Sequence, residues 1–161
     1  MNNLISDKDK TQYEQRGLRR KKFKEKSLKL LIVDDNEEIR ETYGDYLNPY
    51  GTVEMADDGD IAIEKIKEAY LLNNHYDVVL LDLEMERVSG DEVLRKICGK
   101  NGFEESIGVD RIKGSMFIMV TGLNDLSAIQ ENMRYSNVYY IGKGEASIKK
   151  EIIDAINNSL F

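Results

Sequence analysis

The sequence predicts an α/β fold, a doubly wound five-stranded parallel sheet with helices on both faces. Short apolar runs alternate along the chain with segments whose apolar residues recur at helical spacing, which gives five strand-and-helix units. Residues 78–81 are all apolar and lead directly into Asp82. A run of this kind is too short for a helix and is typical of a strand buried on both faces. Right-handed crossovers between such strands leave a doubly wound sheet as the simplest topology.

The five expected strands are short apolar runs bounded by polar or turn-forming residues. In chain order they comprise residues 30–33, 53–56, 76–81, 116–120 and 138–141. Apolar runs of this length favour strands over helices, which need longer segments.

Each expected strand is followed by a segment with a helical pattern. The first helix starts after Asn36 or Asp35, either of which can cap it, and it ends at residues 48–51, which include Pro49. The second helix follows a turn at residues 57–59. The remaining helices are marked by Val88, Val93, Leu94 and Ile97 for the third, by residues 126–134 for the fourth, and by Ile148, Ile152, Ile156 and Leu160, after a cap at Ser147, for the last.

The composition favours one globular domain preceded by a basic arm. The chain has 161 residues, of which 41% are hydrophobic, and no apolar run reaches the roughly 18 residues of a membrane span. Residues 1–29 contain 10 Lys or Arg and 4 Asp or Glu, a balance of +6, whereas the other residues contain 13 and 26, a balance of −13. We therefore expect a flexible or partly helical arm at residues 1–27 and a folded domain at residues 28–161.

The basic arm has two interpretations. Its cluster at residues 19–24 is either a solvated tail or a contact for nucleic acid, an anionic surface or an acidic partner. The acidic domain argues against nonspecific DNA binding by the globular part. The lone Cys98 excludes an internal disulfide, and the polar start lacks a secretory signal, so we expect a cytoplasmic protein.

Four of the expected strands lead into functional side chains, namely Asp34 and Asp35, Asp82, Thr121, and Lys143. Because the carboxyl ends of parallel strands meet at one edge of a sheet, we expect three carboxylates, a hydroxyl and an ammonium to converge. The carboxylates repel one another unless a cation is present, and oxygen ligands with open positions suit Mg²⁺. A carboxylate beside such an ion can attack a phosphoryl group and form an acyl phosphate.

The motifs, taken in order, resemble the receiver domain of two-component response regulators, of the single-domain chemotaxis type. The matching pieces are Leu31-Ile32-Val33-Asp34-Asp35-Asn36, Ala56-Asp57-Asp58-Gly59, Val79-Leu80-Leu81-Asp82-Leu83-Glu84-Met85, Gly90, Thr121-Gly122 and Tyr140-Ile141-Gly142-Lys143. The resemblance covers about 130 residues and implies a flavodoxin-like sheet in the strand order 2-1-3-4-5. It also implies a phosphorylation-activated switch that accepts a phosphoryl group from a histidine kinase or a phosphotransfer protein.

The resemblance implies a role for each residue around the metal ion. Asp82 corresponds to the phosphoacceptor, Asp35 to a direct Mg²⁺ ligand, and Asp34 to a residue that holds a metal-bound water or supports the ligands. The backbone carbonyl of Glu84 corresponds to the third protein ligand, and Mn²⁺ is expected to substitute for Mg²⁺. Beyond phosphotransfer and slow hydrolysis of its own phosphoryl group, the resemblance implies no enzymatic activity.

Three further residues correspond to the moving parts of the family. Thr121 matches the switch hydroxyl, Lys143 the ion-pair partner of the acceptor, and Tyr140 the aromatic side chain that turns inward on activation. Ordinary strand packing is the alternative for Tyr140, because strands favour tyrosine. The resemblance places a downstream protein at the face formed by the fourth helix, the fifth strand and the last helix.

Three features depart from the family pattern. Glu86 and Gly144 stand where the family often has proline, and residues 100–113 form a longer loop that is a partner surface or a tolerated insertion. A trans bond is expected before Gly144, since a cis bond before a non-proline residue costs about 2.5–4 kcal/mol. Gly144 leaves open an alternative function, a receiver-like interaction module that is not phosphorylated. An aspartate-based phosphatase is a further alternative, but Glu84 occupies the second position of its Asp-x-Asp motif.

Overall fold

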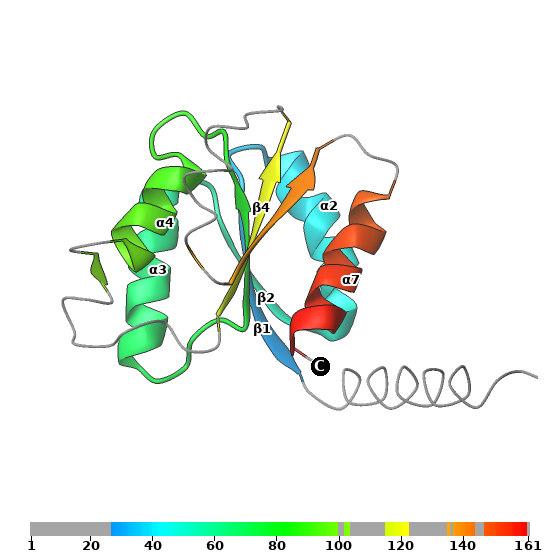
Figure 1. Cartoon of the computed structure of the whole chain (residues 1–161), viewed down its shortest axis with the longest axis horizontal. Coiled ribbons are helices and arrows are strands. Elements are labelled where there is room, and N and C mark those ends of the chain that lie inside the picture. The colour runs from blue at the N-terminus through cyan, green and yellow to red at the C-terminus, as the bar shows by residue number, and fades with distance from the viewer. Residues whose placement is uncertain are drawn as a thin grey trace, which may run out of the picture.

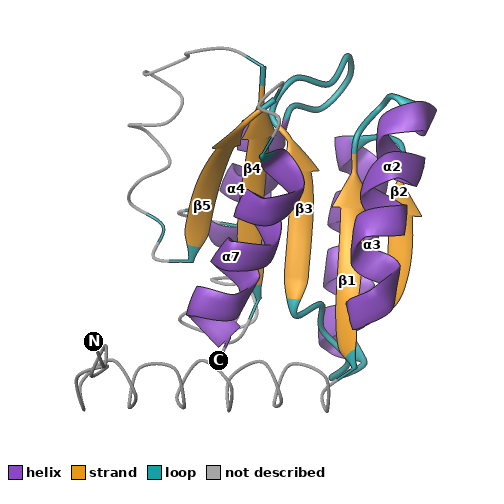
Figure 2. Cartoon of the chain, turned by 90° about the vertical axis from the view of Figure 1, so that its right-hand side faces the viewer, coloured by secondary structure: helices purple, strands orange, loops and turns teal. Residues whose placement is uncertain are grey.

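The structure is a computed structural model, and it describes residues 27–99, 102–103, 115–122, 135, 137–143 and 147–160. Five parallel strands form one sheet in the order β2-β1-β3-β4-β5. Figure 2 shows these strands side by side. The strands are β1 Leu28–Val33, β2 Gly51–Ala56, β3 Val78–Asp82, β4 Met116–Thr121 and β5 Val138–Gly142. This confirms the predicted fold class and the strand order that the family resemblance implied.

Helices cover both faces of the sheet, as Figure 1 shows, with α3 and α4 on one face and α2 and α7 on the other. The helical segments are α2 Glu37–Leu47, the short 3₁₀ turn η1 Asn48–Tyr50, α3 Gly59–Leu71, α4 Gly90–Cys98 and α7 Ile148–Leu160. None of the helices in the described ranges is both long and apolar enough to cross a membrane.

Alternate residues of the strands pack into two separate cores. Leu31, Val79 and Leu81 belong to the core beneath α3 and α4, whereas Ile32 and Leu80 belong to the core beneath α2 and α7. Every residue of β3 is buried, and so is every residue of β4. Their central position therefore explains why these strands are continuously apolar in the sequence.

Three helices begin at side chains that accept backbone hydrogen bonds. Asn36 caps α2, Asp58 caps α3 and Ser89 caps α4. Of the two candidates for the first cap, the structure thus selects Asn36. The prediction that Val88 lies within the third helix is wrong, because α4 starts at Gly90 after its cap at Ser89. Val88 lies in the loop before the cap, and its buried side chain still joins the core.

The predicted strand boundaries differ from those of the structure by one or two residues. β1 and β2 both start earlier than expected, because the parallel ladder already pairs Leu28 with Gly51. β3 starts later than expected, at Val78, and Asp77 before it exchanges hydrogen bonds with Lys29 at the foot of the sheet. Several expectations lie outside the described residues: the arm before residue 27, most of the 100–113 loop, the helix at 126–134, and Gly144.

Candidate functional site

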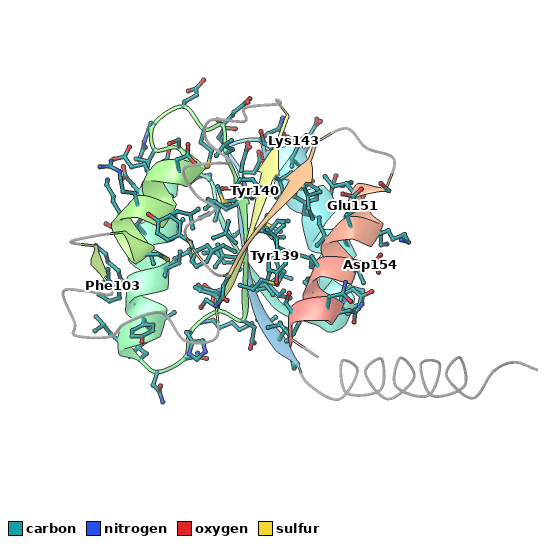
Figure 3. The ribbon with its side chains drawn as sticks, in the orientation of Figure 1. Phe103, Tyr139, Tyr140, Lys143, Glu151 and Asp154 are labelled. Carbon is teal, nitrogen blue, oxygen red and sulfur yellow. The ribbon has the colours of Figure 1, made fainter. Side chains whose placement is uncertain are left out.

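The sheet brings the predicted functional residues to its carboxyl edge. Asp34 directly follows β1, Asp82 is the last residue of β3, and Lys143 directly follows β5. Thr121 is the last residue of β4 and pairs with Gly142 of the neighbouring strand. Figure 3 shows Lys143 at the carboxyl end of β5. Because all five strands are parallel, these strand ends share one edge, as the sequence predicted.

Lys143 forms ion pairs with two buried carboxylates. Its ammonium nitrogen lies 2.6 Å from Oδ2 of Asp82 and 3.3 Å from Oδ2 of Asp34. The side chains of both acids are only 2% exposed, whereas that of Lys143 is 24% exposed. The backbone N–H of Lys143 also donates to the carbonyl of Thr121, which fixes the residue after β5 against the end of β4. The lysine is therefore held above the acids from both its backbone and its side chain.

Three carboxylates come together beside this lysine. One oxygen each of Asp34, Asp35 and Asp82 can be chosen so that all three lie within 4.8 Å of one another. Asp34 and Asp82 are buried, but Asp35 is exposed, so the cluster is open to solvent on one side. Clustered oxygen ligands with one open side are the donor set that Mg²⁺ favours, because this ion retains bound water. The residues present therefore fit a magnesium ion.

Backbone N–H groups orient each of the three carboxylates. The N–H of Asn36 donates to Oδ1 of Asp34 at 2.9 Å. The loop after β3 supplies the other two: the N–H of Glu84 donates to Oδ1 of Asp82 at 3.1 Å, and the N–H of Glu86 donates to Oδ2 of Asp35 at 3.3 Å. All three acids are thus held by backbone N–H groups, and Asp34 and Asp82 are held by Lys143 as well.

The charges at this edge shift the pKa of both partners of the central ion pair. Burial raises the pKa of Asp82, and the nearby Asp34 raises it further, although the hydrogen bond and charge of Lys143 act against this. Burial alone would lower the pKa of Lys143, but Asp82 and Asp34 outweigh it and raise that pKa. Burial and the same two acids raise the pKa of Tyr43 to about 12. Among the described residues, three carboxylates and one ammonium lie together at this edge, so a divalent cation would offset an excess of negative charge.

The remaining predicted residues, Thr121, Glu84 and Tyr140, lie differently with respect to the acids. Thr121 is buried at the end of β4, one residue beyond the partner of Asp82 in the ladder. The side chain of Glu84 is exposed, while its backbone lies beside Asp82 through the N–H hydrogen bond. Tyr140 is half-buried and packs against the core beneath α3 and α4, within β5 and away from its end. Tyr140 therefore lies in the middle of the strand that Lys143 directly follows, and its side chain packs against the core and not at the carboxyl edge.

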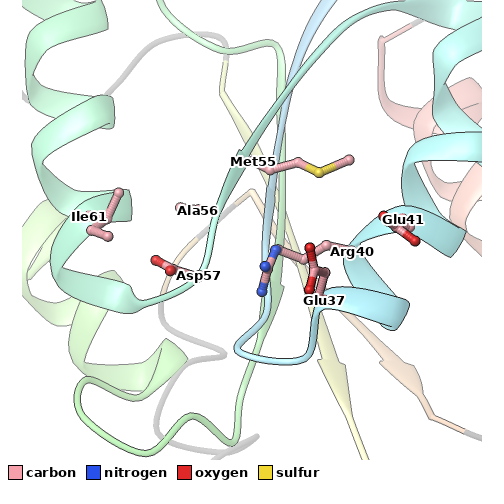
Figure 4. Close-up of a pocket in the computed structure, with 7 residues that line it drawn as sticks. All are labelled: Glu37, Arg40, Glu41, Met55, Ala56, Asp57 and Ile61. Atoms are coloured by element: carbon pink, nitrogen blue, oxygen red, sulfur yellow. The ribbon is translucent and has the colours of Figure 1, made fainter.

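Sequence reasoning did not identify Arg40 as a neighbour of the site. Its guanidinium donates to the backbone carbonyl of Asp34 at 2.7 Å, from the first turns of α2. The same side chain lines an open pocket of about 380 Å³ at the edge formed by α2, the end of β2 and the start of α3 (Figure 4). Arginine on a helix surface is common, and only the fold shows that this one reaches the loop after β1.

Comparison with known proteins assigns the chain to a family. Residues 30–157 match the family described as response regulator receiver domain. The transcriptional regulatory protein DltR of Streptococcus agalactiae is 35% identical over 102 residues, which are 63% of this chain and 42% of that protein. The osmosensing histidine protein kinase SLN1 of Saccharomyces cerevisiae is 35% identical over 68 residues, which are 41% of this chain and 6% of that protein. The chain thus spans less than half the length of these relatives.

Solved structures share the fold. The chemotaxis protein CheY4 of Vibrio cholerae has a TM-score of 0.64 at 20% identity, over 83% of this chain and 98% of that chain. The receiver domain of the histidine kinase CKI1 of Arabidopsis thaliana, complexed with Mg²⁺ and BeF₃⁻, has a TM-score of 0.60 at 23% identity, over 80% and 89%. At these identities the similarity concerns the fold alone.

The strand order, the acidic edge and the family match lead to the same assignment. Receiver domains bind Mg²⁺ at an acidic pocket, and they interact with histidine kinases or phosphotransfer proteins. This chain has an acidic group of Asp34, Asp35 and Asp82 at the carboxyl edge of its sheet. This chain belongs to the response regulator receiver domain family of two-component signalling.

Proposed function

We propose that this chain is a phosphorylation-activated signalling switch in the cytoplasm, with Asp82 as its phosphoacceptor. The observation that carries the proposal is the contact of 2.6 Å between Lys143 and Asp82 inside a cluster of three carboxylates. Three carboxylates beside one ammonium repel one another, which is unfavourable for the stability of the fold. The same arrangement suits the binding of a cation and a phosphoryl group. A histidine kinase or a phosphotransfer protein would supply that group.

The metal ion would be held by oxygen atoms of this edge. The carboxylates of Asp34, Asp35 and Asp82 and the backbone carbonyl of Glu84 would be its protein ligands, with Asp34 acting directly or through a water. Mn²⁺ would substitute, because it favours the same oxygen ligands. When bound, the ion supplies positive charge that neutralises the oxygens of the transferring phosphoryl group.

Asp82 would act as the nucleophile of the transfer. One carboxylate oxygen forms a bond to phosphorus while the bond between phosphorus and the imidazole nitrogen of the donor breaks, and the imidazole leaves with that electron pair. The backbone N–H of Glu84 already orients Oδ1 of Asp82. The product is an acyl phosphate. In the structure the Lys143 ammonium donates a hydrogen bond to Oδ2 of Asp82, so it would be close enough to donate to the phosphoryl oxygens.

The acyl phosphate would bias the edge of the sheet between two arrangements. The Thr121 hydroxyl would turn toward the phosphoryl group, and Tyr140 would follow by moving inward from its half-buried position. Thr121 lies on β4 and Tyr140 on the neighbouring strand β5. We place the downstream protein at the face formed by β5 and α7. Residues 126–134, which the family resemblance adds to this face, lie outside the described ranges.

Phosphorylation by a small-molecule donor tests the proposal without a partner. Wild type is incubated with acetyl phosphate and Mg²⁺ and weighed intact, next to Asp82→Asn and next to a sample with a chelator. We expect one phosphoryl group on wild type and none in the other two samples. Undiminished addition to Asp82→Asn would refute the role of Asp82. A wild type that binds Mg²⁺ but takes up no phosphoryl group would favour the non-phosphorylated interaction module.

A further inference from the structure

We infer that Arg87 is a positioning residue for the metal site, because it ties the loop after Asp82 to the start of α3. This loop, residues 83–89, connects β3 to α4 and carries two of the backbone groups that hold the acids. The inference rests on the proposed function, since its main consequence concerns Mg²⁺ affinity. It assigns a purpose to Asp58 and Asp60, which the proposed phosphotransfer does not otherwise use.

Arg87 contacts two carboxylates at the N-terminus of α3. Its Nε lies 3.2 Å from Oδ2 of Asp58, and one terminal nitrogen lies 3.5 Å from Oδ2 of Asp60. The side chain of Asp58 is 8% exposed, although that of Arg87 is 65% exposed. An ion pair with one buried partner has a better-defined geometry than a pair between two mobile surface side chains. The contact therefore holds the loop against the start of α3.

The α3 end of this contact is rigid. Oδ1 of Asp58 accepts the backbone N–H of Asp60 at 3.0 Å and so caps the helix, which leaves Oδ2 for Arg87. The loop and the helix start also touch through their backbones, because a Cβ added to Gly59 would lie 2.4 Å from the carbonyl oxygen of Val88. Arg87 thus connects the loop to an element that cannot shift easily.

The other side of the loop holds two of the predicted metal ligands. The N–H of Glu84 donates to Asp82, and the N–H of Glu86, the residue immediately before Arg87, donates to Asp35. A displacement at Arg87 is therefore transmitted within one residue to Asp35 and within three residues to the carbonyl of Glu84. Groups that orient metal ligands from outside typically change metal affinity when they are removed.

The sign of the effect separates positioning from plain electrostatics. Arg87 is a cation, so its removal lowers the positive potential near the site and by charge alone would strengthen Mg²⁺ binding. If Arg87 positions the loop, its removal instead weakens Mg²⁺ binding. Arg95 provides a matched control, because it is an exposed arginine of α4 that pairs with Glu92 within its own helix.

The experiment measures Mg²⁺ affinity by titration calorimetry for wild type, Arg87→Ala, Arg87→Lys and Arg95→Ala. We expect Arg87→Ala to weaken Mg²⁺ binding by roughly tenfold, and Arg87→Lys to restore part of the loss. Arg95→Ala should bind as tightly as wild type or slightly more tightly. In metal-free protein, ¹⁵N relaxation should show greater mobility of amides 84–88 in Arg87→Ala than in wild type and Arg95→Ala.

The outcomes separate this inference from the proposed function. Equal Mg²⁺ affinity for Arg87→Ala and Arg95→Ala, together with unchanged mobility of amides 84–88, would overturn the role of Arg87 and leave the metal site intact. A wild type that binds no Mg²⁺ would overturn the proposed metal site, and the relaxation measurement on metal-free protein would still decide whether Arg87 restrains the loop.

Discussion

At the scale of single residues, Lys143 has two opposed effects on the site. Its ammonium compensates the buried acids Asp34 and Asp82, and it is also the cation that repels an incoming metal ion. The same side chain should therefore assist phosphoryl transfer while weakening metal binding. This combination distinguishes a catalytic lysine from one that serves stability alone.

Replacement of the lysine tests both effects together. Lys143→Gln should strengthen Mg²⁺ binding, because a positive charge next to the carboxylates is lost. It should also slow phosphorylation by acetyl phosphate by roughly tenfold or more, because a donor to the phosphoryl oxygens is lost. Calorimetry and intact mass measure the two quantities. Lys150→Gln, which removes an exposed lysine paired with Asp154, is the control, and equal behaviour of the two variants would contradict this role of Lys143.

A second group of residues, at the opposite end of the sheet, makes stability depend on pH. The hydroxyl of Tyr76 donates to Glu54 at 2.8 Å, and the ammonium groups of Lys65 and Lys29 lie 3.3 Å and 3.4 Å from the same carboxylate. Burial raises the pKa of Glu54, but these partners together outweigh it, so the pKa lies below the usual value of 4.5. Because the folded-state pKa is depressed, the stabilisation is complete above the unfolded-state pKa and is lost as pH falls through the folded-state pKa.

Tyr76→Phe should therefore lose stability in a pH-dependent way. The variant keeps the buried ring and loses one hydrogen bond, so urea unfolding at pH 7 should show a loss of about 1 kcal/mol. The difference from wild type should narrow as pH falls below 4.5 and through the lower folded-state pKa of Glu54. In the control Tyr139→Phe, the lost hydrogen bond joins two hydroxyls, those of Tyr139 and Ser159, so its effect should not vary over this range. A difference for Tyr76→Phe that is constant with pH would contradict the account.

At the scale of elements, the start of α4 packs directly on the end of β3. A Cβ added to Gly90 would lie 2.4 Å from the backbone carbonyl oxygen of Asp82 and 2.8 Å from the side chain of Met119. The helix can approach the strand this closely only because residue 90 has no side chain. The position of Asp82 is therefore coupled to the packing of α4.

Gly90→Ala should destabilise the fold by roughly 1–3 kcal/mol, because the new methyl group meets backbone that cannot move away. Urea unfolding measures the loss. In the control Gly122→Ala, the added Cβ would lie 4.0 Å from the nearest side-chain atoms of Lys143, an ordinary contact. An equal loss of stability in both variants would show that the close packing of α4 on β3 is not the cause.

The sequence predicted the elements well where burial shapes the pattern. The central strands are apolar throughout because both faces are covered, so β3 and β4 were recognisable from their residues alone. The edge strand β2 mixes exposed and half-buried residues, and its first residues were missed because they depend on pairing with β1 and not on an apolar run. Val88 was assigned to a helix because it is the apolar residue that precedes Val93, Leu94 and Ile97, although it lies in the loop before the cap at Ser89.

At the scale of the whole molecule, parallel connectivity explains why distant residues could be predicted to meet. Asp82 and Lys143 are 61 positions apart in the sequence, and they meet because parallel strands end at the same edge. The contacts of Arg87 and Arg40 could not be predicted in this way, because they depend on the path of a loop and on a helix surface. The strand order itself was implied by the family resemblance, since periodicity does not determine which strands are neighbours.

Locating the phosphoryl group in the chain decides whether Asp82 is the phosphoacceptor. Wild type treated with acetyl phosphate and Mg²⁺ is digested, and its peptides are analysed by mass spectrometry. We expect one modified residue, Asp82, and no modification without the divalent ion. A phosphoryl group on Asp34, on Asp35 or outside the carboxyl edge of the sheet, or modification that does not require Mg²⁺, would contradict it.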